Sequence, residues 1–258
     1  MKLAPAACPM PHNARLMPRA ARAPASPTAW VRRRWSRASS CGSIASRPRP
    51  EVRVAIQTVL CDLGGVVIRI DADRIREGWA QMSPLPVAEV YAAYPDEVYD
   101  RFERDEVTED EYLHHVRSRL RLEGTDEEIR GAFNDLFLGV DVGTLDVLQR
   151  LRRRGVLTLA LTNTNRTHHR VWSRRFADAL GVFHEVYSSH DLASRKPEPA
   201  VYRRVLQEHG LVPGEVLFID DLPSHVAAAQ AVGLKGIVFT DASTLAEQLE
   251  AFDWPRAG

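Results

Sequence analysis

The chain has 258 residues, of which 45% are hydrophobic and 26% are charged. This length and composition are typical of a folded globular protein with room for a sizeable core. No apolar run approaches the ~18 residues that span a bilayer, so we do not expect an integral membrane protein. The net charge is zero, but residues 1–50 hold ten basic residues and no acidic one, which leaves 24 basic against 34 acidic residues in the rest. This acidic body disfavours nucleic acid as the main partner.

Residues 1–50 also hold eight of the sixteen prolines and show no sustained helical or strand period. We expect this segment to be a disordered tail, because it cannot bury enough apolar surface to offset its ordering entropy. Two functional alternatives are a transit peptide, which would also be rich in Arg and Ser, and a nucleic-acid arm around residues 30–37.

The three cysteines are few and scattered, at positions 8, 41 and 61. Their spacing supports neither a disulfide framework nor a zinc ribbon. This usage is typical of a reducing compartment, and we expect a cytoplasmic protein.

Short unalternated apolar runs after residue 52 predict parallel strands that are covered on both faces. The runs are Val54–Cys61, Val156–Leu161, Val216–Ile219 and Gly236–Phe239. Helical periods separate or follow them, at Leu145–Arg153, Ala200–His209, Val226–Val232 and Thr244–Phe252. This alternation predicts an α/β fold, a doubly wound, Rossmann-like parallel sheet built from residues 51–70 and 142–258.

The insertion between the first two predicted strands, residues 71–141, is predicted to be entirely helical. Five segments carry apolar residues at helical spacing: Ala72–Met82, Pro86–Tyr94, Glu97–Glu106, Glu109–Leu122 and Asp126–Leu138. The insertion leaves after the first strand and returns before the second, so it is placed to cover the carboxyl ends of the strands, where α/β sheets bind ligands. We call residues 71–141 the cap and the rest of the folded chain the core.

Four polar clusters follow the predicted strands or a neighbouring loop: Asp62, Thr162-Asn163, Lys196 and Asp220-Asp221. The Asp and Thr-Asn clusters alone are more often turn or helix-cap chemistry than catalysis, whereas Lys196, directly before a helix start that disfavours a cation, makes most sense beside an anion. Together they fit phosphoryl transfer, in which a carboxylate attacks phosphorus, a hydroxyl and an amide donate to its oxygens, and a lysine balances charge.

An acidic pair in such a set is expected to hold a hard divalent cation. Oxygen ligands favour Mg²⁺ over zinc. The histidine pairs His114-His115 and His168-His169 are adjacent in sequence and cannot share a helix face, so a histidine-based zinc site is not expected.

These clusters resemble the four motifs of the haloacid dehalogenase superfamily, in the same order. The matching segments are Val59-Leu60-Cys61-Asp62-Leu63-Gly64-Gly65-Val66, Leu159-Ala160-Leu161-Thr162-Asn163, Arg195-Lys196-Pro197 and Phe218-Ile219-Asp220-Asp221. The inserted helical cap is similar to the first cap type of that superfamily. Within it, residues 62–66 and 162–166, with His168 and Trp172, look like bacterial α-D-glucose-1-phosphate phosphatases and the N-terminal phosphatase domain of epoxide hydrolases.

The resemblance implies a Mg²⁺-dependent phosphatase acting on a small phosphate ester. It implies Asp62 as the nucleophile, Thr162 and Asn163 on the phosphate, and Lys196 as the charge clamp. The implied metal ligands are Asp62, the backbone carbonyl of Gly64, Asp220 and Asp221, and the candidate substrate contacts are Asn165, His168 and Trp172.

Two positions depart from the superfamily pattern. Gly64 replaces the usual acid/base aspartate, so the carbonyl ligand remains and the proton donor is lost. His225 replaces an asparagine that usually follows the metal-binding pair and is expected to alter the surroundings of the metal.

Three other functions compete with a phosphatase. A phosphomutase is disfavoured because it needs the carboxyl that Gly64 lacks. A haloacid dehalogenase needs no metal, so the Asp220-Asp221 pair disfavours it. A catalytically weak binding or regulatory protein is the alternative motivated by Gly64 and His225. The expected partner is a small phosphate ester without membrane or nucleic acid, and the sequence leaves the oligomeric state open.

Overall fold

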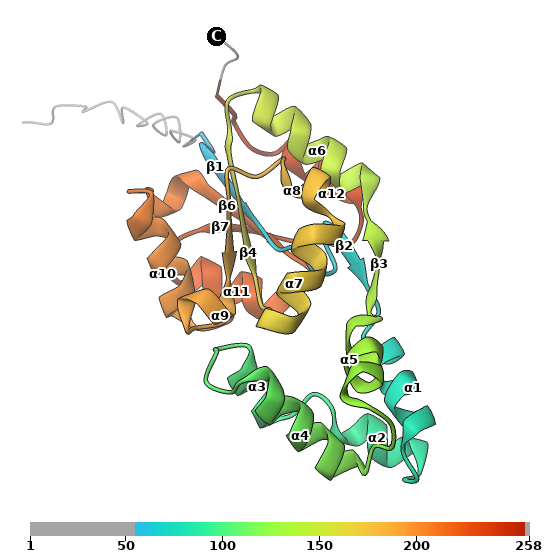
Figure 1. Cartoon of the computed structure of the whole chain (residues 1–258). Coiled ribbons are helices and arrows are strands. Elements are labelled where there is room, and N and C mark those ends of the chain that lie inside the picture. Colours follow the sequence, from blue (N-terminus) through green and yellow to red (C-terminus); the bar gives the residue numbers. More distant parts are fainter. Residues whose placement is uncertain (1–54, 256–258) are drawn as a thin grey trace, which may run out of the picture. The chain divides into compact units, whose positions relative to one another are not determined.

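Five parallel strands form the central sheet of the computed structural model, which describes residues 55–255 (Figure 1). The strand order is β5-β4-β1-β6-β7. The strands are β5 (Glu185–Ser188), β4 (Leu157–Thr162), β1 (Thr58–Cys61), β6 (Val216–Asp220) and β7 (Lys235–Val238). The predicted parallel α/β sheet is therefore confirmed, whereas the predictions for residues 1–50 lie outside the described residues.

Both faces of the sheet are buried, because successive strand residues point to opposite sides. Val59 and Cys61 of β1 pack in one apolar cluster with α6 (Val142–Arg153), α7 (Arg166–Arg175) and α12 (Ala242–Leu249). Leu60 packs in a second cluster with α10 (Pro199–Glu208) and α11 (Pro223–Ala231). Short helices α8 (Ala177–Leu180), α9 (Ser189–Leu192) and η1 (Pro213–Glu215) complete the connections. This two-sided burial is the doubly wound arrangement that the unalternated apolar runs predict.

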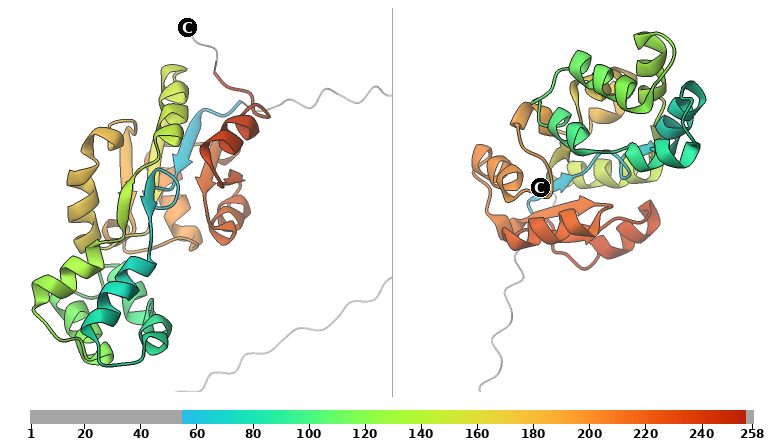
Figure 2. Two further views of the ribbon diagram at one scale, coloured as in Figure 1. Left: turned by 90° about the vertical axis from the view of Figure 1, so that its right-hand side faces the viewer. Right: turned by 90° about the horizontal axis from the view of Figure 1, so that it is seen from below.

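The cap contains the five predicted helices and lies at the carboxyl ends of the strands (Figures 1 and 2). They are α1 (Asp73–Met82), α2 (Val87–Ala93), α3 (Glu97–Phe102), α4 (Glu109–Leu120) and α5 (Asp126–Asn134). Thr108 and Thr125 each begin a helix with a reciprocal capping box, so the starts of α4 and α5 are set by local sequence.

The prediction of an entirely helical insertion is wrong at the base of the cap. There β2 (Ile68–Ile70) and β3 (Phe137–Val140) form an antiparallel pair that joins cap to core. The predicted last helix therefore stops at Asn134 instead of Leu138. Phe133 and Phe137 lie four residues apart, so a strand residue continued the apparent helical period.

In the described part of the chain, no helix is both long enough and apolar enough to cross a membrane.

Candidate active site

The four polar clusters come together at the carboxyl ends of β1, β4 and β6. Asp62 follows β1, Thr162 ends β4, Asp221 follows β6, and Lys196 lies in the loop before α10. Side chains of all four line one cavity of about 330 Å³, together with Asn163. Segments more than 150 residues apart in the sequence thus supply one site, as the parallel sheet requires.

Lys196 is the central charge of this site. Its Nζ lies 2.8 Å from Asp62 Oδ1 and 2.8 Å from Asp220 Oδ2, and the residue is 1% exposed. Burial alone would lower the pKa of Lys196, but the two carboxylates outweigh it and raise that pKa above its ordinary value. The lysine is therefore a permanent cation beside Asp62.

Asp62 lies beside Lys196 but is not held fully ionised by it. Burial raises its pKa to about 7, although Lys196 opposes this rise. One positive charge is thus too little to keep Asp62 fully ionised at neutral pH.

Asn163 contacts the lysine loop more directly than the predicted phosphate role implies. Its Oδ1 accepts a hydrogen bond from Lys196 N at 2.8 Å, and its Nδ2 donates to Lys196 O at 2.9 Å. These reciprocal bonds fix the backbone that carries the charge clamp. Asn163 still lines the cavity, and its side-chain amide has a second hydrogen besides the one donated to Lys196 O.

The two adjacent aspartates have different surroundings. Asp220 is fully buried and is contacted by Lys196, by Leu222 N at 2.9 Å and by His225 Nδ1 at 3.0 Å. Burial opposes its ionisation, but His225 and Lys196 hold the pKa of Asp220 below its ordinary value. Burial and the nearby Asp220 raise the pKa of Asp221, which is half-buried and lines the cavity. Asp220 therefore organises the site, while Asp221 is the carboxylate that faces the cavity.

The donor set fits a hard divalent cation. Ligand atoms of Asp62, Asp220 and Asp221 all lie within 4.8 Å of one another. Three carboxylates share the single lysine, and burial, with repulsion between the carboxylates as a smaller cause, raises the pKa values of Asp62 and Asp221. Carboxylate oxygens are the ligands that Mg²⁺ prefers.

The loop after β1 brings the backbone close to this acidic group. Gly65 has φ +82°, and a Cβ there would collide with the Asp221 carboxylate. Glycine is required at this position both by the backbone conformation and by the close approach. Gly64 differs, because its Cβ would meet only Ile70 Cδ1, at 3.3 Å.

The three candidate substrate residues have different positions. Trp172 and His168 line the cavity, but Asn165 does not. Asn165 is fully buried and caps α7, where its Oδ1 accepts from His168 N at 2.9 Å. Asn165 is therefore a positioning residue for His168, and its burial disfavours the substrate contact that the sequence predicts.

His168 cannot supply the proton that Gly64 lacks. Its Nε2 lies 3.0 Å from the Phe133 carbonyl, which only accepts, and its Nδ1 lies 3.2 Å from Asn165 Nδ2. Both ring nitrogens are thus engaged in the neutral tautomer. Burial lowers the pKa of His168 to about 4, so it is not an acid at neutral pH.

Another histidine group forms outside the cavity. Donor atoms of His169, His190 and Asp191 lie within 4.8 Å of one another, and none of the three lines the cavity. The adjacent His168 and His169 face different ways, as helical spacing dictates. Sequence reasoning missed this group because its members come from α7 and α9.

The cap supplies residues to the cavity that sequence reasoning also missed. Tyr99 and Glu103 line it, and so does Arg195, the neighbour of Lys196. Glu103 and Arg195 lie 92 residues apart in sequence, and no spacing pattern connects them. The adjacency of Arg195 to the charge clamp is the one sequence signal that points to this end of the cavity.

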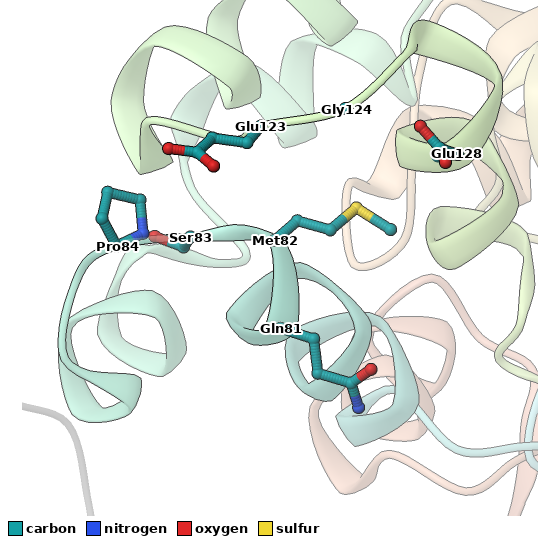
Figure 3. A pocket seen from close by; sticks show the side chains of 7 residues that line it. All are labelled: Gln81, Met82, Ser83, Pro84, Glu123, Gly124 and Glu128. Atoms are coloured by element: carbon teal, nitrogen blue, oxygen red, sulfur yellow. The ribbon is translucent and has the colours of Figure 1, made fainter.

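A second cavity, of about 380 Å³, lies within the cap (Figure 3). Its lining includes the carboxylates of Glu123 and Glu128 and no basic residue. A phosphate ester is repelled by such a lining. The cavity at the strand ends, which holds Lys196, is therefore the candidate active site.

Comparison with known proteins agrees with this geometry. The profile of a hydrolase family, haloacid dehalogenase-like hydrolase, matches residues 56–233. A D-ribitol-5-phosphate phosphatase of Bacteroides thetaiotaomicron is 25% identical over 187 residues, covering 70% of this chain and 90% of that protein. A sesquiterpene phosphatase, astK, of Aspergillus oryzae is 29% identical over 154 residues, covering 56% of this chain and 74% of that protein.

Solved structures place the chain in the same group. A HAD family enzyme of Bacteroides thetaiotaomicron has a TM-score of 0.66 and 25% identity, covering 73% of this chain and 95% of that chain. The same enzyme was solved with magnesium and inorganic phosphate, with a TM-score of 0.63. With the family profile spanning more than half of the sequence, the chain belongs to the haloacid dehalogenase-like hydrolases.

Proposed function

We propose that this hydrolase is a Mg²⁺-dependent phosphatase that releases phosphate from small phosphomonoesters through an aspartyl-phosphate at Asp62. The observation that carries the proposal is the buried Asp62 carboxylate, 2.8 Å from Lys196 Nζ, at the floor of a cavity that Asp221 also lines. A nucleophile, a fixed cation and a second carboxylate are the parts that phosphoryl transfer needs.

In the first step an Asp62 carboxylate oxygen attacks phosphorus, and the bond from phosphorus to the alcohol oxygen breaks with its electron pair. Lys196 and the Thr162 hydroxyl would stabilise the charge on the phosphoryl oxygens. In the second step water attacks phosphorus, which frees inorganic phosphate and restores the Asp62 carboxylate. A bound Mg²⁺, held by Asp62, Asp221 and the Gly64 carbonyl, would add positive charge next to the nucleophile and the phosphoryl group.

Release of the alcohol distinguishes this site from the usual family pattern. Gly64 has no carboxyl, and His168 has both nitrogens engaged. With neither of these groups available, we expect the departing oxygen to take its proton from water. Esters with acidic leaving groups should accordingly react fastest.

Polyol and sugar phosphates are the substrate class that we propose. The similarity to a ribitol-5-phosphate phosphatase supports it. α-D-Glucose 1-phosphate, which the sequence resemblance implies, belongs to this class, and its hemiacetal oxygen leaves more readily than an ordinary alkoxide.

Two alternatives are separated from this proposal by one assay. A haloacid dehalogenase would work without metal, and a regulatory protein would bind phosphate esters without turnover. The assay is release of inorganic phosphate from a panel of sugar and polyol phosphates, with Mg²⁺ or with EDTA. Phosphate release that requires Mg²⁺ supports the proposal, and no release from any ester in Mg²⁺ overturns it.

The same assay tests the division of labour between the aspartates. Asp221→Asn should raise the Mg²⁺ concentration needed for half-maximal activity by about 10- to 100-fold. Asp220→Asn should chiefly lower kcat, because Lys196 and His225 lose the carboxylate charge that holds them in place. Asp178→Asn, an exposed carboxylate on α8, is the matched control and should change neither.

A further inference from the structure

Glu103 and Arg195 form a charged pair in the wall of the active-site cavity. Glu103 lies at the C-terminal end of cap helix α3, and Arg195 lies in the core loop that carries Lys196. Glu103 is 3% exposed, and both residues line the cavity. The pair therefore joins cap to core where a substrate's alcohol part would lie.

The geometry of this pair leaves hydrogen-bonding capacity unused. Arg195 Nη2 lies 2.9 Å from Glu103 Oε2, yet the contact is out of alignment for a hydrogen bond. Among the described residues, Glu103 Oε2 and Arg195 Nε have no hydrogen-bond partner, although both atoms are buried. Buried polar atoms usually have a protein or solvent partner, so these two atoms in the cavity wall have capacity to bind a polar ligand group.

Charged and polar groups face Glu103 from both the core and the cap. Arg195 and Lys196 face it from the core, while Asp100 and Tyr99 face it from its own helix. Burial raises the pKa of Glu103 despite Arg195. A neutral hydroxyl suits this setting better than another charge. It can donate to the carboxylate and accept from the guanidinium, and binding it does not require the desolvation of another ion.

We propose that Glu103 and Arg195 bind hydroxyl groups of the alcohol part of the substrate and select polyol and sugar phosphates over unsubstituted alkyl phosphates. This inference rests on the proposed phosphatase function. Arg195 and Lys196 are neighbours, with Cα atoms ~3.8 Å apart. Lys196 contacts the nucleophile Asp62 while Arg195 contacts the cap, and Asp62, Glu103 and Arg195 line the same cavity, which therefore connects the phosphoryl position with the pair.

A purely structural latch between cap and core is the competing role of the pair. Other ion pairs cross the same boundary, for example Asp105 with Arg166 at 2.7 Å, and neither of those residues lines the cavity. Asp105→Asn thus weakens a cap–core contact without touching the cavity, and it is the matched control.

The experiment compares two esters with similar leaving groups, a pentitol 5-phosphate and n-pentyl phosphate, in the full chain with Mg²⁺. Glu103→Ala should lower kcat/KM for the pentitol phosphate by about 10- to 100-fold and leave n-pentyl phosphate nearly unchanged. Glu103→Gln, which keeps the shape of the side chain, should show the same selectivity loss in smaller measure. Asp105→Asn should affect both esters equally.

Each failure has a distinct signature. Equal losses on both esters in the Glu103 variants would assign a latch and overturn the inference, while the phosphatase function stands. An unchanged pentitol preference would overturn it as well. No phosphate release from either ester by the unmodified protein, with p-nitrophenyl phosphate also inert, would overturn the proposed function and this inference with it.

Discussion

Gly64 occupies the position from which a carboxyl would protonate the leaving alcohol in the family pattern. A Cβ at Gly64 would meet only the flexible end of Ile70, at 3.3 Å, so a small shift of that side chain admits it. We expect Gly64→Asp to speed hydrolysis of primary-alcohol phosphates by up to ~10²-fold, and p-nitrophenyl phosphate much less, since general acid catalysis helps poor leaving groups most. The measurement is kcat/KM across a leaving-group series for both proteins.

Gly65→Ala is the contrasting variant next to it. A Cβ at Gly65 would collide with Asp221, and φ +82° disfavours any side chain there. This variant should lose most activity on every ester.

The leaving-group series also tests the role of Gly64 in the unmodified enzyme. A rate for the unmodified enzyme that is independent of leaving-group acidity, when chemistry is rate-limiting, would show that another residue supplies the proton.

The proposed Mg²⁺ binding should depend on pH through Asp62. Its pKa of about 7 means that a proton competes with Mg²⁺ for the carboxylate below neutrality. The apparent Mg²⁺ affinity should therefore rise by about tenfold per pH unit up to pH ~7 and then level off. Titration calorimetry over this range measures it, with Asp62→Asn expected to remove most of the dependence. A flat profile in the unmodified protein would place the pKa of Asp62 well below neutrality.

At the scale of elements, α5 links the core of the cap to the active site. Phe133 is fully buried, stacks on Trp79 with ring centroids 5.6 Å apart, and stacks on His168 at 4.0 Å. We expect Phe133→Ala to lower the free energy of unfolding by about 3–5 kcal/mol, and Phe133→Leu by less, because leucine fills more of the volume. Urea unfolding measures both. A loss below ~1 kcal/mol for the alanine variant would contradict a tightly packed aromatic cluster.

The same scale shows where sequence periods mislead. The strands β1, β4, β6 and β7 were predicted because they are continuous apolar runs. β5 was missed because its sequence, Glu-Val-Tyr-Ser, is short and half polar, and its place in the sheet depends on pairing with β4. The β2–β3 pair was missed because each strand is short and is stabilised only by pairing with the other. The two strands lie about seventy residues apart in the sequence, so neither segment alone indicates the pair.

At the scale of the whole molecule, the cap meets the core through charged contacts. In the described chain, four arginines pair with carboxylates across this boundary: Arg104 with Glu198, Arg166 with Asp105, Arg170 with Glu109 and Arg195 with Glu103. Partly exposed pairs are worth only ~0–1 kcal/mol each and weaken with salt. Screening by salt can therefore loosen these charged contacts, whereas the apolar packing of Phe133 and Phe137 against His168 is not sensitive to it.

Hydrogen exchange tests this directly. Raising salt from about 0.1 to 1 M shortens the Debye length from ~10 to ~3 Å, so amides of α3 should exchange faster. Amides of β1 and β6 in the core are the internal control and should not respond. Equal salt effects on cap and core would show that the ion pairs do not govern cap opening.

The candidate site was predictable from the sequence where one residue lies at a strand end, as with Asp62 and Thr162, or directly before a helix start, as with Lys196. The roles of other site residues were not predictable, because they depend on contacts between segments that are far apart in the sequence. Asn165 is a helix cap, and Glu103 meets Arg195 only because the cap folds over the core. The finer resemblance to α-D-glucose-1-phosphate phosphatases stays a prediction, because it depends on such contacts with the alcohol.

The central claim is that phosphate release passes through Asp62. The most direct test is the rate of inorganic phosphate release from a polyol phosphate in Mg²⁺ by the unmodified protein and by Asp62→Asn, both checked for folding by circular dichroism. The account predicts phosphate release by the first and at least a ~10⁴-fold lower rate for the second, because the nearly isosteric amide cannot form the phosphoenzyme. Comparable rates from the two folded proteins would contradict it.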